Sequence, residues 1–195
     1  MLLKAFEGSL LEIPVYLALA TGARLGEILA LTWEDMDLAK GVLHIRRALS
    51  KNRLTGALEF KEVKTQKSRR AIEIGPATVE RLKKHRVHQR EMRLAAGPVW
   101  QDYGLVCCRE DGSPLNPHTV SARFSEKAAE LGLKLGFHDL RHTHATMLLK
   151  AGINPKIVSE RLGHSTVGMT LDIYSHVLLT MQREAARAIE RVIKM

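Results

Sequence analysis

Five side chains spread along this sequence are of the types that could together carry out phosphoryl transfer. They are Arg24, His138, Arg141, His164 and Tyr174. Arginine and histidine can bind and neutralise a phosphate group, and a tyrosine hydroxyl can attack it as a nucleophile. These are the groups needed for a phenol to attack a phosphodiester. No nucleotide-cofactor motif in the sequence offers a competing chemistry.

The local spacing around these residues is compatible with a shared phosphate site. In the segment 138–141 a histidine and an arginine lie three positions apart, which places them on one face of a helix. Gly163 would end a helix and present His164 from a loop. Glu27 follows Arg24 by three positions and could orient its guanidinium. Each pattern alone is also typical of ordinary surface or core residues, so the inference depends on the whole set.

The charge of the chain favours a polyanionic partner. The 195 residues include 30 Lys and Arg against 21 Asp and Glu, for a formal net charge of +9, and 45% are hydrophobic. This length and apolar content predict one well-packed globular domain. An excess of basic residues suits nucleic acid, although a solvated basic surface without a partner would have the same composition.

Cysteine usage and hydropathy predict a cytoplasmic protein. The two cysteines, Cys107 and Cys108, are adjacent, so they form neither a disulfide framework nor a CxxC metal pair, and a reducing compartment suits them. The apolar run 10–20 contains Glu12 and Pro14 and is too short to span a bilayer. It also lacks the basic leader and cleavage site of a secretory signal. We therefore expect no membrane anchoring.

The hydrophobic periodicity predicts a mainly helical α+β protein with one small antiparallel sheet of three strands. Apolar residues recur at helical spacing in segments of about 10–20, 24–31, 76–95, 117–131, 138–150, 155–162, 168–174 and 180–193. Three short segments rich in apolar or β-branched residues predict the strands, at 42–45, 58–63 and 70–74. The last two flank the polar segment 64–69, which we expect to form the tip of a basic hairpin.

Taken in chain order, these motifs resemble those of the tyrosine recombinases, the phage integrase family. The set comprises Arg24 with Glu27, a lysine in a β-hairpin, the HxxRH segment 138–142, the LGH segment 162–164 and a following tyrosine. The resemblance covers essentially the whole chain from about residue 10 to residue 176. As a set, the motifs are highly specific.

The resemblance implies a role for each residue of the set. Tyr174 corresponds to the nucleophile, and Arg24 and Arg141 correspond to the arginines on the scissile phosphate. Lys64 corresponds to the general acid. The remaining positions are two histidines and one supporting acidic residue, which are His138, His164 and Glu27.

Elementary physical chemistry agrees with these roles. Only about one part in a thousand of a phenol is ionised at pH 7, so attack by Tyr174 needs a proton acceptor, for which His138 is the better candidate. The transition state gathers negative charge on nonbridging oxygens, where planar arginine forks bind well. The leaving deoxyribose oxygen is strongly basic, so an ammonium such as that of Lys64 can usefully donate a proton to it.

The resemblance also implies that the protein is bacterial or phage-encoded, and it implies partners and a domain organisation. The family forms a 3'-phosphotyrosyl DNA intermediate without ATP, metal or other cofactor, and four protomers hold two double-stranded DNA sites. A C-terminal segment often docks onto a neighbour, and here 180–193 would be that helix unless it packs on its own domain. Family members normally carry a core-binding domain ahead of the catalytic domain. We expect 1–195 to be the catalytic domain alone.

Several basic residues are candidates for DNA contacts from their placement in the chain. They are Lys61, Lys67, Arg69 and Arg70 around the expected hairpin, Arg46 and Arg47 just before it, and Arg123 on the helix that follows Asn116 and Pro117. Such contacts would address phosphates and position the duplex rather than read its sequence.

Three other functions fit parts of the pattern. A metal hydrolase is conceivable because His138, His142 and His144 lie close together, but Asp139 and Arg141 replace the HExxH pattern and an arginine is unfavourable in a cation site. A DNA-binding module that has lost catalysis would keep the same charge. Type IB topoisomerases share the chemistry, although the compact stretch from LGH to the tyrosine looks more like the integrases.

Overall fold

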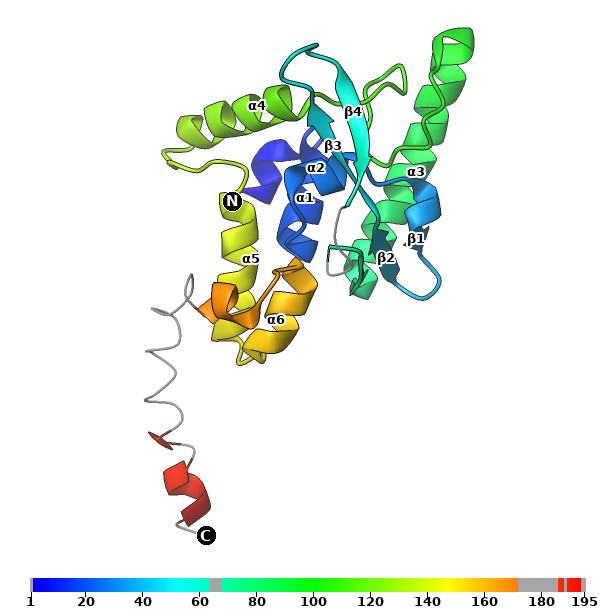
Figure 1. The fold of residues 1–195 in the computed structure, drawn as a ribbon. Helices are drawn as coiled ribbons and strands as arrows, with labels where there is room; N and C mark the ends of the chain where they lie inside the picture. Colours follow the sequence, from blue (N-terminus) through cyan, green and yellow to red (C-terminus); the bar gives the residue numbers. More distant parts are fainter. Residues whose placement is uncertain (1, 64–67, 172–185, 188, 194–195) are drawn as a thin grey trace.

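The computed structural model describes residues 2–63, 68–171, 186–187 and 189–193 of the chain. Their fold is mainly helical with a small amount of antiparallel sheet (Figure 1), which confirms the predicted fold class. Lys64, Lys67 and Tyr174 lie outside the described residues. No helix in the described part of the chain is long and apolar enough to cross a membrane.

The N-terminal helices are separated where the sequence predicts a break. After the 3-10 helix η1 (Leu3–Phe6), helix α1 (Glu12–Thr21) ends at Gly22, which has a left-handed φ of 67° and donates its N–H to the carbonyl of Ala18. Helix α2 (Leu25–Leu29) follows after two residues. Arg24, the first residue of the predicted helical segment 24–31, is the N-cap residue of α2 and has extended backbone, so it lies one position before the helix.

The strands form two sheets rather than one. A three-stranded sheet has the order β1 (Met36–Asp37), β2 (Val42–Ile45) and β5 (Arg70–Glu73), and a two-stranded sheet pairs β3 (Arg47–Lys51) with β4 (Leu58–Glu62). All pairs are antiparallel. The 3-10 helix η2 (Trp33–Asp35) leads into β1.

The predicted pairing of 58–63 with 70–74 is therefore wrong. Segment 58–62 pairs with the unpredicted strand β3, and β5 pairs instead with β2, where Leu43 lies opposite Ile72. Burial explains why β5 pairs with β2. Leu43 and Ile72 are 0% and 1% exposed, and they hold β5 against the core. Strand β3 was missed because Leu49 is its single buried residue.

The later helices begin where proline and asparagine predict. Pro76, Pro117 and Pro155 lie at the first positions of α3 (Pro76–Ala96), α4 (Pro117–Glu130) and α6 (Pro155–Leu162), and the side chains of Asn116 and Asn154 accept backbone N–H groups as N-caps. Helix α5 (Asp139–Lys150) lies between α4 and α6, and η3 (Gly97–Val99) follows α3. Residues 167–171 are helical, as are the described parts of 186–193.

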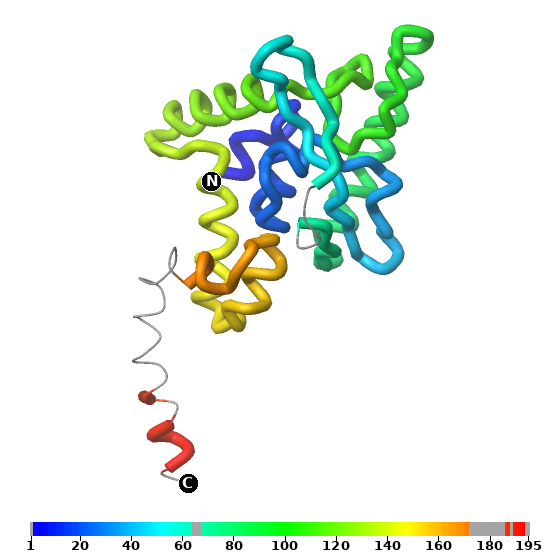
Figure 2. The backbone as a smooth tube through the Cα atoms, in the orientation of Figure 1, coloured from blue at the N-terminus to red at the C-terminus, as the bar shows by residue number. Residues whose placement is uncertain are grey.

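The buried apolar side chains form two cores. The larger core joins η1, α1, α2, the strands and α4, and it includes the stacked rings of Phe6 and Phe124, whose centroids are 5.4 Å apart. The smaller core consists of Ala145, Leu149, Val158 and Leu162 and joins α5 to α6. Figure 2 shows this helix pair packed beside α1.

Candidate active site

Arg24 and Glu27 meet as the sequence predicts, and a third residue joins them. Glu27 accepts hydrogen bonds from the backbone N–H of Arg24 at 2.9 Å and from its Nη1 at 3.0 Å. Arg70 donates from Nη2 to Oε2 of the same carboxylate at 2.8 Å. Burial raises the pKa of the Glu27 carboxyl, but the hydrogen bonds and charges of Arg70 and Arg24 outweigh it and hold the pKa below its usual value. Glu27 is therefore an ionised carboxylate between two guanidinium groups.

Arg141 is held by backbone carbonyls from two distant segments. Its Nη1 donates to the carbonyl of Gly22 at 2.7 Å, and its Nη2 donates to that of Leu162 at 2.8 Å. The residue is only 3% exposed. A guanidinium has five N–H donors, which is more than these two anchors use. The left-handed turn at Gly22 is what directs its carbonyl towards α5.

The predicted histidines lie close enough to these arginines for the arginine charges to lower their pKa values. His138 is the residue just before α5, and burial, His142 and the charges of Arg141 and Arg24 lower its pKa. His164 is 9% exposed, and burial followed by the charges of Arg141, Arg24 and Arg70 lowers its pKa to about 4. Both imidazoles are consequently neutral at pH 7. His138 can accept a proton there, and His164 can donate a hydrogen bond without carrying charge.

Thr170 orients the imidazole of His164. The Nδ1 atom of His164 lies 2.8 Å from the hydroxyl oxygen of Thr170, which is fully buried in the helix at 167–171. The backbone N–H of His164 also donates to the carbonyl of Ser159 in α6. If the hydroxyl donates to Nδ1, the imidazole proton resides on Nε2. The sequence drew no attention to Thr170, although its position between the LGH motif and Tyr174 is a usable signal.

The structure thus brings together four of the six predicted catalytic residues with the supporting acid. Arg24, His138, Arg141 and His164 come from the start of α2, the start of α5 and the end of α6, and Glu27 lies behind Arg24. The positions of Lys64 and Tyr174 are not among the described residues. What lies between these elements is a cluster of anion-binding donors beside two neutral imidazoles.

His144 of α5 and Arg161 of α6 bind each other and the last turn of α1. His144 donates from Nδ1 to the carbonyl of Leu19 at 2.7 Å and accepts at Nε2 from the Nε of Arg161 at 3.1 Å. Arg161 also donates to the carbonyls of Ala20 and Glu73. Burial and the charges of Arg161 and Arg141 lower the pKa of His144, whereas the hydrogen bond to the Leu19 carbonyl raises it. Burial is the largest effect, and the resulting pKa is about 4.

That arrangement removes His144 from the alternative metal site. Its two ring nitrogens are both engaged with the protein, whereas the His138 and His142 rings contact each other edge to face at 4.8 Å. Among the described residues, no group of three or more His, Cys, Asp or Glu side chains is arranged to hold a metal ion. The metal-hydrolase interpretation therefore loses His144, one of the three histidines on which it depends.

The predicted DNA contacts fall into exposed and buried classes. Four lie near the strands with partly exposed side chains, each paired with an acid: Arg46 and Arg47 with Asp35, Lys61 with Glu59 and Arg69 with Glu62. Arg70 differs, because its side chain is 6% exposed and its donors are directed inward to Glu27. Nε, Nη1 and Nη2 of Arg70 all donate to acceptors within the protein, so the structure argues against Arg70 as a DNA contact. Alternation along β5 is a signal for this, since Arg70 shares a face with buried Ile72.

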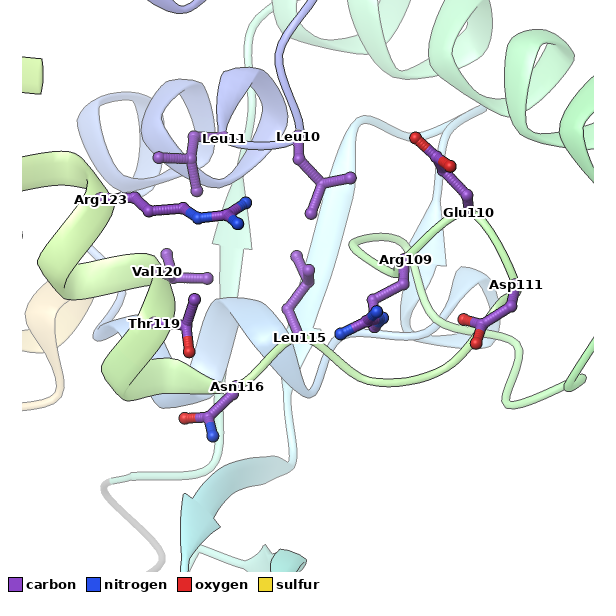
Figure 3. A pocket seen from close by; sticks show the side chains of 10 residues that line it. All are labelled: Leu10, Leu11, Arg109, Glu110, Asp111, Leu115, Asn116, Thr119, Val120 and Arg123. Atoms are coloured by element: carbon purple, nitrogen blue, oxygen red, sulfur yellow. The ribbon is translucent and has the colours of Figure 1, made fainter.

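Arg123 is exposed on α4 at the edge of a pocket. The pocket has a volume of about 370 Å³ and is also lined by Leu10, Leu11 and Arg109. Figure 3 shows the guanidinium of Arg123 extending into it beside Leu11. Arg109, which is not among the predicted DNA contacts, brings a second positive charge to the same pocket.

Comparison with known proteins agrees with the geometry. The model of the phage integrase family matches residues 4–181. A tyrosine recombinase XerC-like protein of Caldanaerobacter subterraneus subsp. tengcongensis is 32% identical over 95% of this chain and 50% of its own length. The integrase of Staphylococcus phage L54a is 30% identical over 89% of this chain and 49% of its own length. The chain thus spans about half the length of these relatives.

Solved structures show the same fold. The Tn1549 transposon integrase in complex with circular intermediate DNA superposes with a TM-score of 0.75 at 23% identity, covering 96% of this chain and 64% of that one. XerA recombinase gives a TM-score of 0.71 at 20% identity, covering 94% of this chain and 60% of that one. Because the family model matches nearly the whole sequence, and because the fold and the clustered motif residues agree with it, the protein belongs to the phage integrase family.

Proposed function

We propose that residues 1–195 form the catalytic part of a site-specific DNA recombinase that cleaves and rejoins strands through Tyr174. The observation that carries the proposal is the meeting of Arg24 and Arg141 beside two imidazoles that are neutral at pH 7. A phosphodiester is the group that such a donor-rich cluster would bind. Relatives named as integrases and tyrosine recombinases support the same reaction.

The proposed reaction assigns one task to each residue. The scissile phosphate binds to Arg141, which is fixed by the carbonyls of Gly22 and Leu162, and to Arg24, which is fixed by Glu27. The phenol oxygen of Tyr174 attacks phosphorus while His138 accepts its proton, and His164 donates to a nonbridging oxygen. The bond from phosphorus to the 5' oxygen breaks, and Lys64 donates a proton to that oxygen.

The bond energy is retained in this scheme. The product is a 3'-phosphotyrosyl DNA strand and a free 5'-hydroxyl, so attack by another 5'-hydroxyl reverses the step and rejoins DNA without a cofactor. When that hydroxyl comes from a second duplex, strands are exchanged. Exchange would use four protomers on two duplexes, with 180–193 as a docking helix. The exposed Ile189, Val192 and Ile193 of the described part provide an apolar contact for it.

DNA is the proposed partner, held by cations outside the site. Arg46, Arg47, Lys61 and Arg69 around the strands and Arg123 on α4 would contact phosphates, and Lys67 belongs to the same set by its place in the sequence. A catalytically silent DNA-binding module would keep these contacts, so binding alone does not distinguish the two functions. Covalent chemistry at Tyr174 does.

The experiment is capture of the covalent intermediate. A labelled library of nicked duplexes with random central sequence is incubated with the protein in EDTA, and adducts that survive denaturation are isolated and sequenced. The nick lets the short 5'-hydroxyl strand diffuse away, so that the intermediate accumulates. We expect an adduct with the wild type and with Tyr103→Phe, whose exposed ring lies beside Phe60, and none with Tyr174→Phe.

Each other result has a defined meaning. Retarded DNA without any adduct would favour the silent binding module. An adduct that persists in Tyr174→Phe would assign the nucleophile to a different residue. Loss of the wild-type adduct in EDTA would bring back metal-dependent chemistry.

A further inference from the structure

Arg70 lies buried where three elements of the site meet. Its side chain is 6% exposed and belongs to β5. Nη2 donates to Glu27 Oε2 at 2.8 Å and Nη1 to Oε1 at 3.3 Å, and Nε donates to the carbonyl of Arg161 in α6 at 2.7 Å. Nη1 also contacts the carbonyl of Ser68 at 3.2 Å. The guanidinium thus connects β5 to α2 and to α6.

Through Glu27, Arg70 acts on the orientation of Arg24. Both Glu27 oxygens are shared between the two arginines, yet the side chain of Arg24 is 43% exposed whereas that of Arg70 is buried. A half-exposed arginine held on one side has many rotamers available. Arg70 is buried and binds both oxygens of the Glu27 carboxylate, so that carboxylate is fixed. A fixed carboxylate restricts Arg24 to the orientation in which its other donors point outward.

Arg70 also supports the turn that presents His164. Gly163 has a left-handed φ of 68°, and a Cβ added to it would lie 2.9 Å from Nη1 and 3.1 Å from Cζ of Arg70. Only a glycine backbone can approach the guanidinium this closely. Because Arg70 additionally binds the carbonyl of Arg161, both the last turn of α6 and the glycine that ends it rest against the same side chain.

We propose that Arg70 is a positioning residue of the active site, which sets Arg24 through Glu27 and sets His164 through the backbone at Arg161 and Gly163. The inference rests on the proposed function, since it assigns Arg70 a part in that reaction. It replaces the sequence-based expectation that Arg70 contacts DNA. Arg70 acts through other residues and itself touches no reacting atom.

The test compares Arg70→Met and Arg70→Lys with the wild type in the covalent-adduct assay. We expect Arg70→Met to bind the duplex as the wild type does and to react about 100-fold more slowly, because small displacements of positioned groups have effects of that size. Lysine keeps the charge but cannot bind two Glu27 oxygens and the Arg161 carbonyl together, so Arg70→Lys should recover only part of the rate. Arg93→Met, which removes a surface arginine of α3 that is paired with Asp102, is the matched control and should react normally.

A pH profile separates positioning from a loss of folding. The described charges that act on Glu27 are Arg24 from α2 and Arg70 from β5. Without Arg70, burial raises the pKa of the Glu27 carboxyl, so the rate of Arg70→Met relative to wild type should fall further as the pH is lowered from 8 to 6. Adding Glu27→Gln should remove this extra pH dependence without restoring the rate.

The outcomes distinguish this proposal from the proposed function. If the wild type forms no adduct, the proposed function fails. If the wild type reacts and Arg70→Met reacts at a similar rate, the positioning role is wrong. A loss of duplex affinity in proportion to the loss of rate would instead make Arg70 a DNA contact. If Arg70→Met does not fold, the same comparisons are made with Arg70→Lys, for which a wild-type rate would overturn the proposal.

Discussion

Acidification should destabilise the protein through His144, which is buried as a neutral imidazole beneath the site. Its pKa in the folded protein is about 4, against an ordinary value of 6.5. The unfolded chain therefore binds a proton more readily than the folded one. The stability contributed by the neutral form is complete above the unfolded value and is lost as the pH falls towards 4.

The size of the effect follows from the difference between the two pKa values. A shift from 6.5 to about 4 corresponds to about 3 kcal/mol of unfolding free energy over the whole range. About 2 kcal/mol of this should be lost between pH 7 and pH 5, since that interval covers most of the titration in the unfolded state. His164, whose pKa is also about 4, adds a comparable loss of unfolding free energy. That loss is the same in the wild type and in a variant of His144.

Urea denaturation at pH 7, 6 and 5 measures the loss. His144→Gln keeps a donor for the Leu19 carbonyl and an acceptor for Arg161 but cannot be protonated in this range, so it should lose about 2 kcal/mol less than the wild type over the interval. His118→Gln, which removes an exposed imidazole at the start of α4, controls for the loss of a histidine. An identical pH dependence in wild type and His144→Gln would refute the reasoning.

Three further outcomes are expected. Gly22→Ala should lower the unfolding free energy by about 2–5 kcal/mol, because the turn is left-handed and the added Cβ would lie 2.6 Å from His144 Cδ2; Gly152→Ala, left-handed but with open space around it, should lose only about 1–2 kcal/mol in the same denaturation assay. Thr170→Val should slow adduct formation about fivefold by freeing the imidazole of His164, whereas Thr170→Ser should not. Arg46→Gln should reduce the slope of log affinity for DNA against log salt by about 0.9, measured by titration at several salt concentrations.

Local signals in the sequence predicted the helices and the spacing of the site well. Proline at first helical positions and asparagine caps mark α4 and α6, and the three-residue spacing of Arg24 and Glu27 gave their contact correctly. Such signals depend on neighbours within one helical turn, so the sequence displays them directly.

Long-range partnerships were not predictable in the same way. Whether segment 58–62 pairs with 47–51 or with 70–73 depends on which strand can bury its apolar face, and that choice is made by the whole core. The contact between Arg70 and Glu27 joins residues 43 positions apart, and that between Arg161 and His144 joins different helices. From the sequence, Arg70 is a basic residue near a basic loop, which favours a DNA contact. Its partner in the structure is Glu27 of α2.

The dependence of Arg141 on the carbonyl of Leu162 has a consequence for synthesis of the chain. The larger core is complete without α6, since its buried members end at Leu140, whereas Arg141, Arg70 and His144 all take partners from α6. A ribosome releases the N-terminal portion for folding first. We therefore expect a nascent chain to become compact before it can bind a phosphate, because assembly of the site waits until α6 has emerged.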